Sequence, residues 1–412
     1  MPTGCVAKTC YSRLGTSLAV LTLLGASTAR AAAQSPEPAT REAAIKTAQA
    51  EKVPTLHPFV PERGERLMDK AQSLLNGPDD GWHPFFASAY RGGGFPFGVG
   101  YRQYLSSYNA IDVRGSYTAS GYKRVEAEFV APRLFEGRGQ LSVLGGWREA
   151  TQVGFFGVGT ATSADDRTNY AFRRPYASAL LSVAPTRNYL TLQGGAEWTR
   201  WSQRPGEGTV PSVDTRFTSA TLSGLGAEPT YLHSQGTVGF DWRTSPGYSR
   251  RGGFYGVTFH DFTDRDNAFG FQQLDYEAIQ HLPIFRDAWT LSLHGKASTT
   301  SRKDGEDIPF FMLPALGGGT DLRGFSSWRF RDRDSLLLQG EWRIMVNRFL
   351  DTALFYDAGT VASRLGDINL HRLKSDYGFG ARIHGPFQTF LRIDIARSNE
   401  KTALVLSSSA IF

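Results

Sequence analysis

The segment LLLQGEWRIMV, residues 336–346, decides the fold class because apolar and polar side chains alternate along it. A period of two is typical of a β-strand with one apolar and one polar face. Segments 374–384 and 387–397 alternate in the same way. In a transmembrane barrel, one face of each strand contacts lipid and the other faces water. The apolar face of the quoted segment contains Leu336, Leu338, Trp342, Ile344 and Val346, and the polar face contains Gln339, Glu341 and Arg343.

The same pattern extends outward from this segment over residues 84–412, where Gly, Pro, Asp, Asn and Ser separate alternating stretches. We therefore predict an all-β domain, a 16-stranded antiparallel transmembrane β-barrel, with the even strand number of bacterial barrels. The predicted strands are 85–90, 97–104, 109–118, 122–132, 139–149, 170–183, 188–201, 231–244, 253–264, 269–282, 288–299, 334–346, 350–361, 374–384, 387–397 and 401–412.

A soluble β-sandwich is the alternative, since its strands also alternate. The last predicted strand favours the barrel: it ends the chain on Phe412 and places Leu404, Leu406 and Ala410 on the same lipid-facing parity. Phe412 is accordingly interpreted as a C-terminal assembly signal. After the first 33 residues no apolar run approaches the roughly 18 residues of a membrane helix. A membrane-spanning chain of this kind has to be a closed barrel.

The N-terminal residues 1–33 have the order of a secretory signal peptide, with Lys8 and Arg13 before an apolar run and alanines at its end. Cys5 and Cys10, the two cysteines of the sequence, both precede that run. Their removal excludes cysteine catalysis, disulfides and Cys-ligated metal from the mature chain. Residues 34–83 are rich in proline and charge and are predicted to be a periplasmic linker with one short helix over 61–75.

The predicted connection 300–333 is long enough to be functional. It contains Leu322-Arg323-Gly324-Phe325 after the glycines at 317–319. The following strands contain Glu341-Trp342-Arg343 and Phe355-Tyr356-Asp357-Ala358-Gly359. An earlier stretch contains Phe155-Phe156-Gly157-Val158-Gly159, followed by Asp165, Asp166, Arg167, Thr168 and Tyr170.

Together these motifs resemble the BamA/TamA-like outer-membrane β-barrel superfamily, the bacterial surface antigen type, over essentially all of 85–412. The resemblance implies that loop 300–333 folds into the lumen. Arg323 would then form charge-assisted hydrogen bonds to Glu341 and Asp357 on adjacent strands. Gly324 would allow a tight turn, and Phe325 would fill lumen space. The alternative for Glu341 and Asp357 is that both only line a wet pore.

The resemblance also implies localisation in the bacterial outer membrane, contact with outer-membrane lipid, and the barrel-assembly machinery as a partner during biogenesis. It implies insertion or translocation of a protein or lipid client through a seam between the first and last strands. The short predicted strand 85–90, which precedes glycines 92–94, favours a weak seam, although the last strand contains no glycine. Because residues 34–83 are predicted to be linker and helix, we expect a member without POTRA domains. A passive diffusion channel is the alternative function.

Enzymatic chemistry is not predicted. The sequence contains no G-x-S-x-G elbow of the kind a serine esterase requires. The histidines after residue 84 lack metal-ligand spacing, and no helix follows the glycine runs in the manner of a nucleotide site. Basic residues are spread along the chain with no nucleic-acid motif. We therefore expect no catalytic residue, cofactor, metal or nucleic-acid partner.

Overall fold

The computed structural model describes residues 40–52, 66, 70, 80–185, 189–408 and 412. The predicted signal peptide lies outside the described residues. Most of the predicted helix 61–75 does as well, although Arg66 and Lys70 are helical. The chain forms two compact units, 1–61 and 62–412. None of the helices in the described ranges is both long and apolar enough to cross a membrane.

The first unit contains helix α1 (Arg41–Lys52), in a stretch that was predicted to be linker. Its alanines and long charged residues favour helix formation. The hydroxyl of Thr40 accepts a hydrogen bond from the Ala43 amide at 3.2 Å and caps the first turn. Glu42 and Lys46 form an i,i+4 ion pair of 3.1 Å, although both side chains are largely exposed. No residue of α1 is buried, so local interactions alone account for it.

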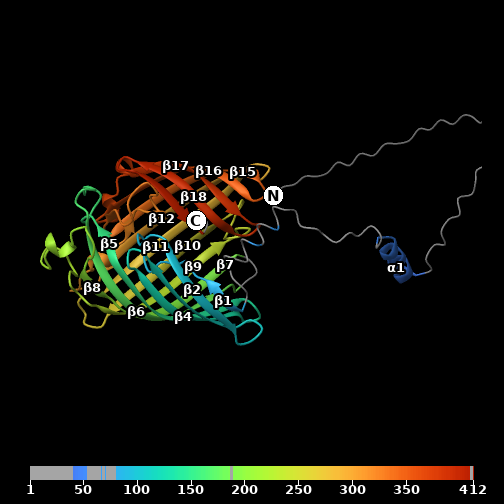
Figure 1. Ribbon diagram of the computed structural model, residues 1–412, viewed down its shortest axis with the longest axis horizontal. Coiled ribbons are helices and arrows are strands. Elements are labelled where there is room, and N and C mark those ends of the chain that lie inside the picture. The colour runs from blue at the N-terminus through green and yellow to red at the C-terminus, as the bar shows by residue number, and fades with distance from the viewer. Residues whose placement is uncertain (1–39, 53–65, 67–69, 71–79, 186–188, 409–411) are drawn as a thin grey trace, which may run out of the picture. The chain divides into compact units, whose positions relative to one another are not determined.

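The second unit is an antiparallel sheet in which each strand pairs with its neighbours in the sequence (Figure 1). β7 and β8 both pair with β6 and count as one interrupted strand, so the predicted number of sixteen strands is confirmed. The strands are β1 (Gly81–Pro84), β2 (Pro96–Tyr104), β3 (Ala110–Thr118), β4 (Lys123–Leu134), β5 (Gly139–Phe155), β6 (Thr168–Val183), β7 (Leu190–Arg200), β8 (Ser202–Pro205), β9 (Thr230–Asp241), β10 (Gly252–Asp264), β11 (Phe271–Phe285), β12 (Trp289–Arg302), β15 (Asp334–Asn347), β16 (Leu350–Ala362), β17 (Lys374–His384), β18 (Thr389–Ser398) and β19 (Thr402–Ser407).

The long connection between β12 and β15 forms a small sheet of its own, from β13 (Ala315–Leu316) and β14 (Phe330–Arg331). The short 3-10 helices are η2 (Val213–Thr215), η3 (Phe310–Met312), η4 (Leu365–Asp367) and η5 (Leu370–Arg372). Long connections gather at one end of the barrel, which we call the loop end. Short connections such as 286–288 and 348–349 lie at the other, which we call the turn end.

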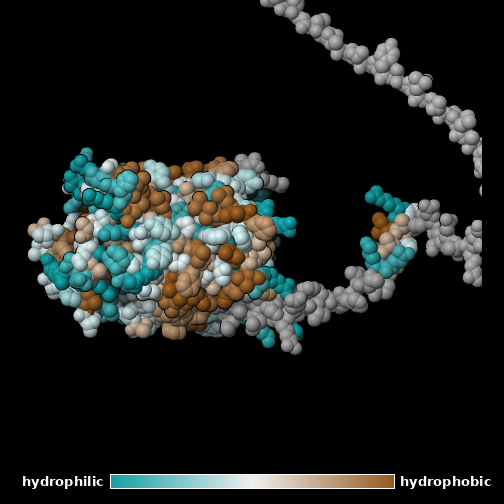
Figure 2. All heavy atoms as spheres, turned by 90° about the horizontal axis from the view of Figure 1, so that it is seen from above, coloured by the Kyte–Doolittle hydropathy of each residue, from teal (hydrophilic) through white to brown (hydrophobic). Residues whose placement is uncertain are grey.

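The two faces of the strands separate as predicted. On β15, Leu338 and Trp342 are 41% and 37% exposed, whereas Glu341 between them is 2% exposed. On β17, Tyr377 and Phe379 also face outward and are exposed. Hydrophobic residues cover the middle of the barrel surface and give way to hydrophilic ones at the loop end (Figure 2). This distribution fits an outward face in contact with lipid.

The first predicted strand, 85–90, is wrong. β1 ends at Pro84, and residues 85–95 leave the sheet along the inner side of β2, β3 and β4. The Ser116 hydroxyl on β3 donates to the Ala87 carbonyl at 2.5 Å, and Arg124 on β4 donates to the Ser88 carbonyl at 3.3 Å. Inward polar side chains therefore satisfy this backbone in place of a strand ladder.

The last strand also differs from its prediction. β19 ends at Ser407, and the predicted lipid-facing position of Phe412 is wrong. The Phe412 ring stacks on His294 of β12 at a centroid distance of 5.0 Å, and His294 is a buried residue of the inner face. The C-terminal aromatic ring therefore lies inside the barrel. Its role as an assembly signal stays a prediction.

Candidate functional site

The connection between β12 and β15 delivers Arg323 to the inner wall of the barrel, where the side chain is fully buried. Its Nε and Nη2 donate to the two carboxylate oxygens of Asp357 on β16, at 2.7 and 2.8 Å. Its Nη1 donates to Glu341 on β15 at 3.1 Å. Both predicted acids thus contact the predicted arginine, and the contact to Asp357 is bidentate.

A further acid and a further cation complete this arrangement. Nη1 of Arg323 also donates to Asp394 on β18 at 3.2 Å. Arg382 on β17 donates to Glu341 at 2.6 Å and pairs with Asp394 as well. We call Arg323, Glu341, Asp357, Arg382 and Asp394 the lock. Its two cations and three acids are all nearly fully buried, which is tolerable only because each charge has several partners.

An aromatic ring backs the lock. The guanidinium carbon of Arg323 lies 3.4 Å from the ring centroid of Phe355 on β16. A planar cation over a ring gains attraction that grows when water is excluded. Gln339 adds hydrogen bonds to the Asp357 carboxylate at 3.1 Å and to the Asp321 carbonyl at 2.8 Å. The loop is therefore attached to the wall through both its side chains and its backbone.

Gly324 and Phe325 lie next to Arg323, but the structure gives a different reason for the glycine than the predicted tight turn. Gly324 does not have the positive φ of a left-handed turn. It is needed for close approach, because a Cβ there would lie 2.7 Å from the Cβ of Asp376 and 2.9 Å from the Ser398 amide nitrogen. Phe325 is 2% exposed and packs edge to face on Phe330 at 5.2 Å. These contacts seat the loop tip against β17 and β18.

Three other segments contact the same loop, namely residues 90–91, the loop after β5 and the turn between β18 and β19. The indole of Trp328 donates to the Arg91 carbonyl at 3.0 Å and stacks on Tyr90 at 4.4 Å. The Arg91 guanidinium pairs with Asp321 at 2.5 Å. The loop after β5, singled out by its Phe-Phe-Gly-Val-Gly motif, donates from the Gly159 amide to the Arg331 carbonyl at 2.8 Å. Arg329 donates to the hydroxyl of Thr162 and forms an ion pair with Glu400.

A seam lies between β19 and the N-terminal part of the barrel. Among the described residues, no strand ladder joins β19 to β1 or β2, although β19 pairs with β18 over Thr402–Ser407. A pocket of about 480 Å³ occupies this place and is lined by residues 88–96 on one side and 401–407 on the other. We call it the seam pocket. An unpaired strand edge of this kind is a template for β-augmentation.

Residues 242–251 connect β9 to β10 at the turn end, and we call them the strap. Gly247 forms a bridge with Gln388, next to the start of β18, and its carbonyl accepts from the Thr389 amide at 3.0 Å. Tyr248 stacks on His384 at 3.7 Å and donates to Asp351 at 2.6 Å. Since β11, β12, β15 and β16 separate β10 from β17 in the sheet, the strap crosses the barrel mouth.

The charges around the strap keep it in place. Arg250 donates to Asp351 at 2.7 Å, and Arg343 on β15 donates to the Ser249 carbonyl. Burial and the hydrogen bond to Asp351 raise the pKa of the Tyr248 hydroxyl well above its usual range. The hydroxyl therefore stays protonated and remains a donor to that carboxylate.

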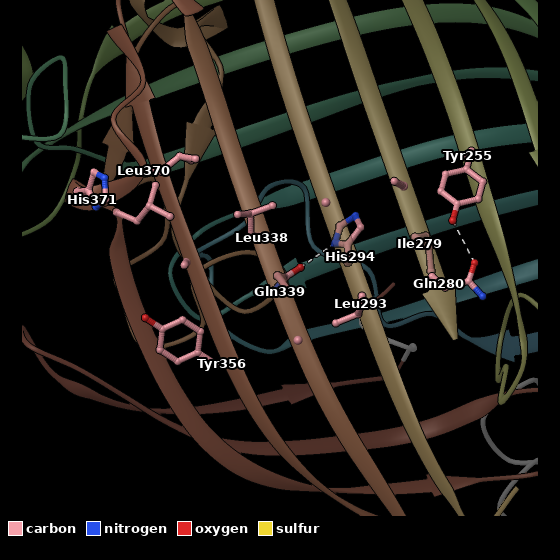
Figure 3. Close-up of a pocket in the computed structure, with 15 residues that line it drawn as sticks. Tyr255, Ile279, Gln280, Leu293, His294, Leu338, Gln339, Tyr356, Leu370 and His371 are labelled. Carbon is pink, nitrogen blue, oxygen red and sulfur yellow. Dashed lines mark hydrogen bonds between the residues drawn. The ribbon is translucent and has the colours of Figure 1, made fainter. Parts of the chain in front are cut away.

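A separate pocket of about 690 Å³ lies over β10–β16 (Figure 3). Its walls include Tyr255, Leu293, Leu338 and Tyr356, each more than 40% exposed on the outward face. It is a hollow of the lipid-facing surface and contains no member of the lock. Among the residues that the structure describes, no cluster of three His, Cys, Asp or Glu side chains is placed to hold a metal ion.

The predicted site did not include Asp394, Arg382 or Arg392. The sequence does place these three residues on the polar faces of two alternating strands. What was missing was the position of the loop arginine relative to β18. That depends on how far the loop reaches across the lumen, and strand parity carries no such information.

Taken together, an inward-folded loop held by a buried arginine and an unpaired first-to-last seam define a class of outer-membrane barrel with a filled interior. Residues 108–404 match the Omp85 superfamily domain, and the chain belongs to this family. Barrels of this family reside in outer membranes and act in transport and assembly. A search of curated proteins found no match.

Two solved structures resemble this barrel. The BamA structure from Haemophilus ducreyi lacking POTRA domains 1–3 matches with a TM-score of 0.56 at 15% identity, covering 79% of this chain and 68% of that one. CdiB from Acinetobacter baumannii matches with a TM-score of 0.49 at 11% identity, covering 80% of this chain and 55% of that one. At this identity, the likeness to BamA concerns the fold.

Proposed function

We propose that this protein assists the insertion or translocation of a protein or lipid client at the bacterial outer membrane, through the seam between β19 and the N-terminal strands. The observation that carries the proposal is the edge of β19 over residues 402–406, which pairs with no strand of the described residues and lies beside the seam pocket. A client strand can add to such an edge through backbone hydrogen bonds. A lipid can enter the same gap, because Leu404 and Leu406 of β19 face the bilayer and are more than half exposed.

Two obstructions inside the barrel weigh against the passive channel. The lock holds the β12–β15 connection in the lumen on the loop-end side, and the strap crosses the turn end. Sixteen strands can enclose a channel, but only where the lumen is not filled. With long loops extracellular and short turns periplasmic, solutes would meet one obstruction from either side. A seam avoids both, since it opens sideways into the membrane.

The test is to close the seam chemically. A variant with Phe95→Cys and Leu404→Cys places one thiol on each side of the seam pocket. After reconstitution into vesicles, cross-linking with a flexible bis-maleimide should abolish folding of a barrel client and transbilayer movement of a fluorescent lipid. The reference is the same variant without cross-linker, and both of its activities should clearly exceed those of the cross-linked form. The matched control is Leu338→Cys with Tyr356→Cys, a pair on neighbouring strands away from the seam.

If cross-linking the seam leaves both activities unchanged, the seam is not the route. If neither activity exists and the barrel instead conducts ions steadily, the passive channel replaces the proposed function.

A further inference from the structure

Arg392 is a buried cation with donors that find no partner in the protein. It lies on the inner face of β18 and is 1% exposed. Its Nη2 donates to the Gly319 carbonyl at 2.6 Å. Among the described residues, no acceptor reaches its Nη1 or Nε. Buried donors of a charged group are costly to leave unsatisfied, so this arrangement indicates a group that binds there.

The nearest acid does not supply that partner. The Nε of Arg392 lies 3.5 Å from Asp394, which already accepts hydrogen bonds from Arg323 and Arg382. A contact of that length adds charge attraction but is a poor hydrogen bond. In the lock, every guanidinium that faces Asp394 also has a second acid. Arg392 has none.

Arg392 lines the seam pocket, and the pocket is entirely basic in its charged residues. Arg91, Arg323, Arg392 and Lys401 line it, and no Asp or Glu does. Arg91 and Arg323 are neutralised by acids outside the pocket. Lys401 has no ion pair within the described part of the chain. The pocket therefore presents cationic donors and no acid among its lining residues, which favours an anionic ligand.

The remainder of the pocket is apolar and opens toward lipid. Phe95, Leu404 and Leu406 line it, with exposed fractions of 56%, 66% and 57%. A ligand suited to both parts has an anionic group joined to a long apolar chain. A client strand offers a neutral backbone along its length, so it does not account for the inner cation. A bilayer lipid carries a phosphate next to its acyl chains and already surrounds β19.

We propose that the seam pocket binds a membrane lipid, with the headgroup phosphate at Arg392 and an acyl chain along Phe95, Leu404 and Leu406. The proposal rests on the proposed function and names the substrate class of the same seam. Lys401 lies six residues from Ser407, the register partner of Arg392, which is about 20 Å along a strand. It therefore lines the loop-end entrance of the pocket and does not share the phosphate with Arg392.

The experiment measures lipid affinity of the full chain in a neutral detergent by native mass spectrometry with phosphatidylglycerol. Arg392→Gln should weaken binding about tenfold, the effect of losing one charge-assisted hydrogen bond. The matched control is Arg397→Gln, which removes the same charge from the outward face of the same strand and should leave the affinity unchanged. Equal affinity of Arg392→Gln and the unaltered protein would overturn the proposal.

A second variant keeps the test decisive if Arg392→Gln fails to fold. Ala403→Phe fills the seam pocket from β19, replaces no residue of the lock and should also weaken phosphatidylglycerol binding. Unchanged binding in this variant would contradict the site. Inorganic phosphate in excess should not displace the lipid, and full displacement would show a site for the anion alone. Because no client is present, failure here leaves the cross-linking result on the seam untouched, and the two proposals are separately testable.

Discussion

The lock and the seam pocket each contain a buried arginine at the inner wall, and the two arginines differ in their partners. In the lock, Arg323 makes hydrogen bonds to three buried carboxylates. In the seam pocket, Arg392 has a single carbonyl acceptor and donors to spare. Both arginines are fully buried, so burial alone does not distinguish them. The difference lies in how many carboxylates of the barrel wall accept hydrogen bonds from each arginine. A saturated arginine holds a loop closed, whereas an arginine with free donors can bind a ligand.

The strongest way to break this comparison is Arg323→Ala. The change leaves Glu341, Asp357 and Asp394 with Arg382 as the remaining cation of the lock. Breaking a buried, multiply bonded ion pair typically costs about 3–5 kcal/mol. We expect the barrel to insert and stay folded, while residues 317–333 become sensitive to protease in limited proteolysis.

The control for that experiment is Arg216→Ala, which removes an arginine from another long loop. Arg216 pairs with Asp166 at 3.3 Å, and both side chains are more than 40% exposed. A surface pair of this kind contributes little. Equal protease sensitivity in the two variants would show that Arg323 does not hold the loop.

Asp357→Asn should have a smaller effect than Arg323→Ala. Arg323 loses its bidentate partner but keeps Glu341 and Asp394, so we expect a cost of about 1–3 kcal/mol. Thermal unfolding of the two single variants and the double variant measures the coupling. Both changes break one interaction, and the double variant should be far from additive. Strict additivity would mean that the two residues stabilise the barrel independently.

Glu341 and Asp357 show how much of the site could be predicted from the sequence. Strand parity predicted that Glu341 and Asp357 share the inner wall, and the family resemblance of residues 322–325 and their neighbouring motifs identified the loop arginine. The alternation along 336–346 was sufficient for the wall because it depends on neighbours two positions apart. Contacts within one hairpin and its adjacent loop are therefore accessible to pattern reasoning.

Contacts across the lumen were not accessible in the same way. The strap could not be predicted, because its contact with Gln388 joins strands that are not neighbours in the sheet. Residues 85–90 were predicted to form a strand, yet inward side chains of β3 and β4 hold their backbone. The lipid-facing parity predicted for Phe412 is wrong, because its ring stacks on His294 of the inner face. In each case the deciding partner lies far away in sequence.

Gly324→Ala tests the close approach of the loop to the wall. The added Cβ would meet the Cβ of Asp376 at 2.7 Å, so either the loop or β17 must shift. Overpacking of this kind costs about 1–3 kcal/mol. We expect a lower unfolding temperature and partial protease sensitivity of the loop. Gly366→Ala is the matched control, because a Cβ there has open space. The reason given for Gly324 is contradicted if both variants behave alike.

The smallest expected effect concerns the strap, which closes the turn end as the lock closes the loop end. Tyr248→Phe keeps the ring on His384 and removes the hydroxyl that donates to Asp351. The change also removes the acceptor for a hydrogen bond from Arg250, but Arg250 still donates to Asp351, so the net loss should be about 1–2 kcal/mol. We expect a slightly lower unfolding temperature and no rise in single-channel conductance, since the ring continues to hold the strap. The control is Tyr255→Phe on the outward face. A clear rise in conductance for Tyr248→Phe alone would show that one hydrogen bond keeps the mouth closed, and that the turn end is a gate and not a fixed obstruction.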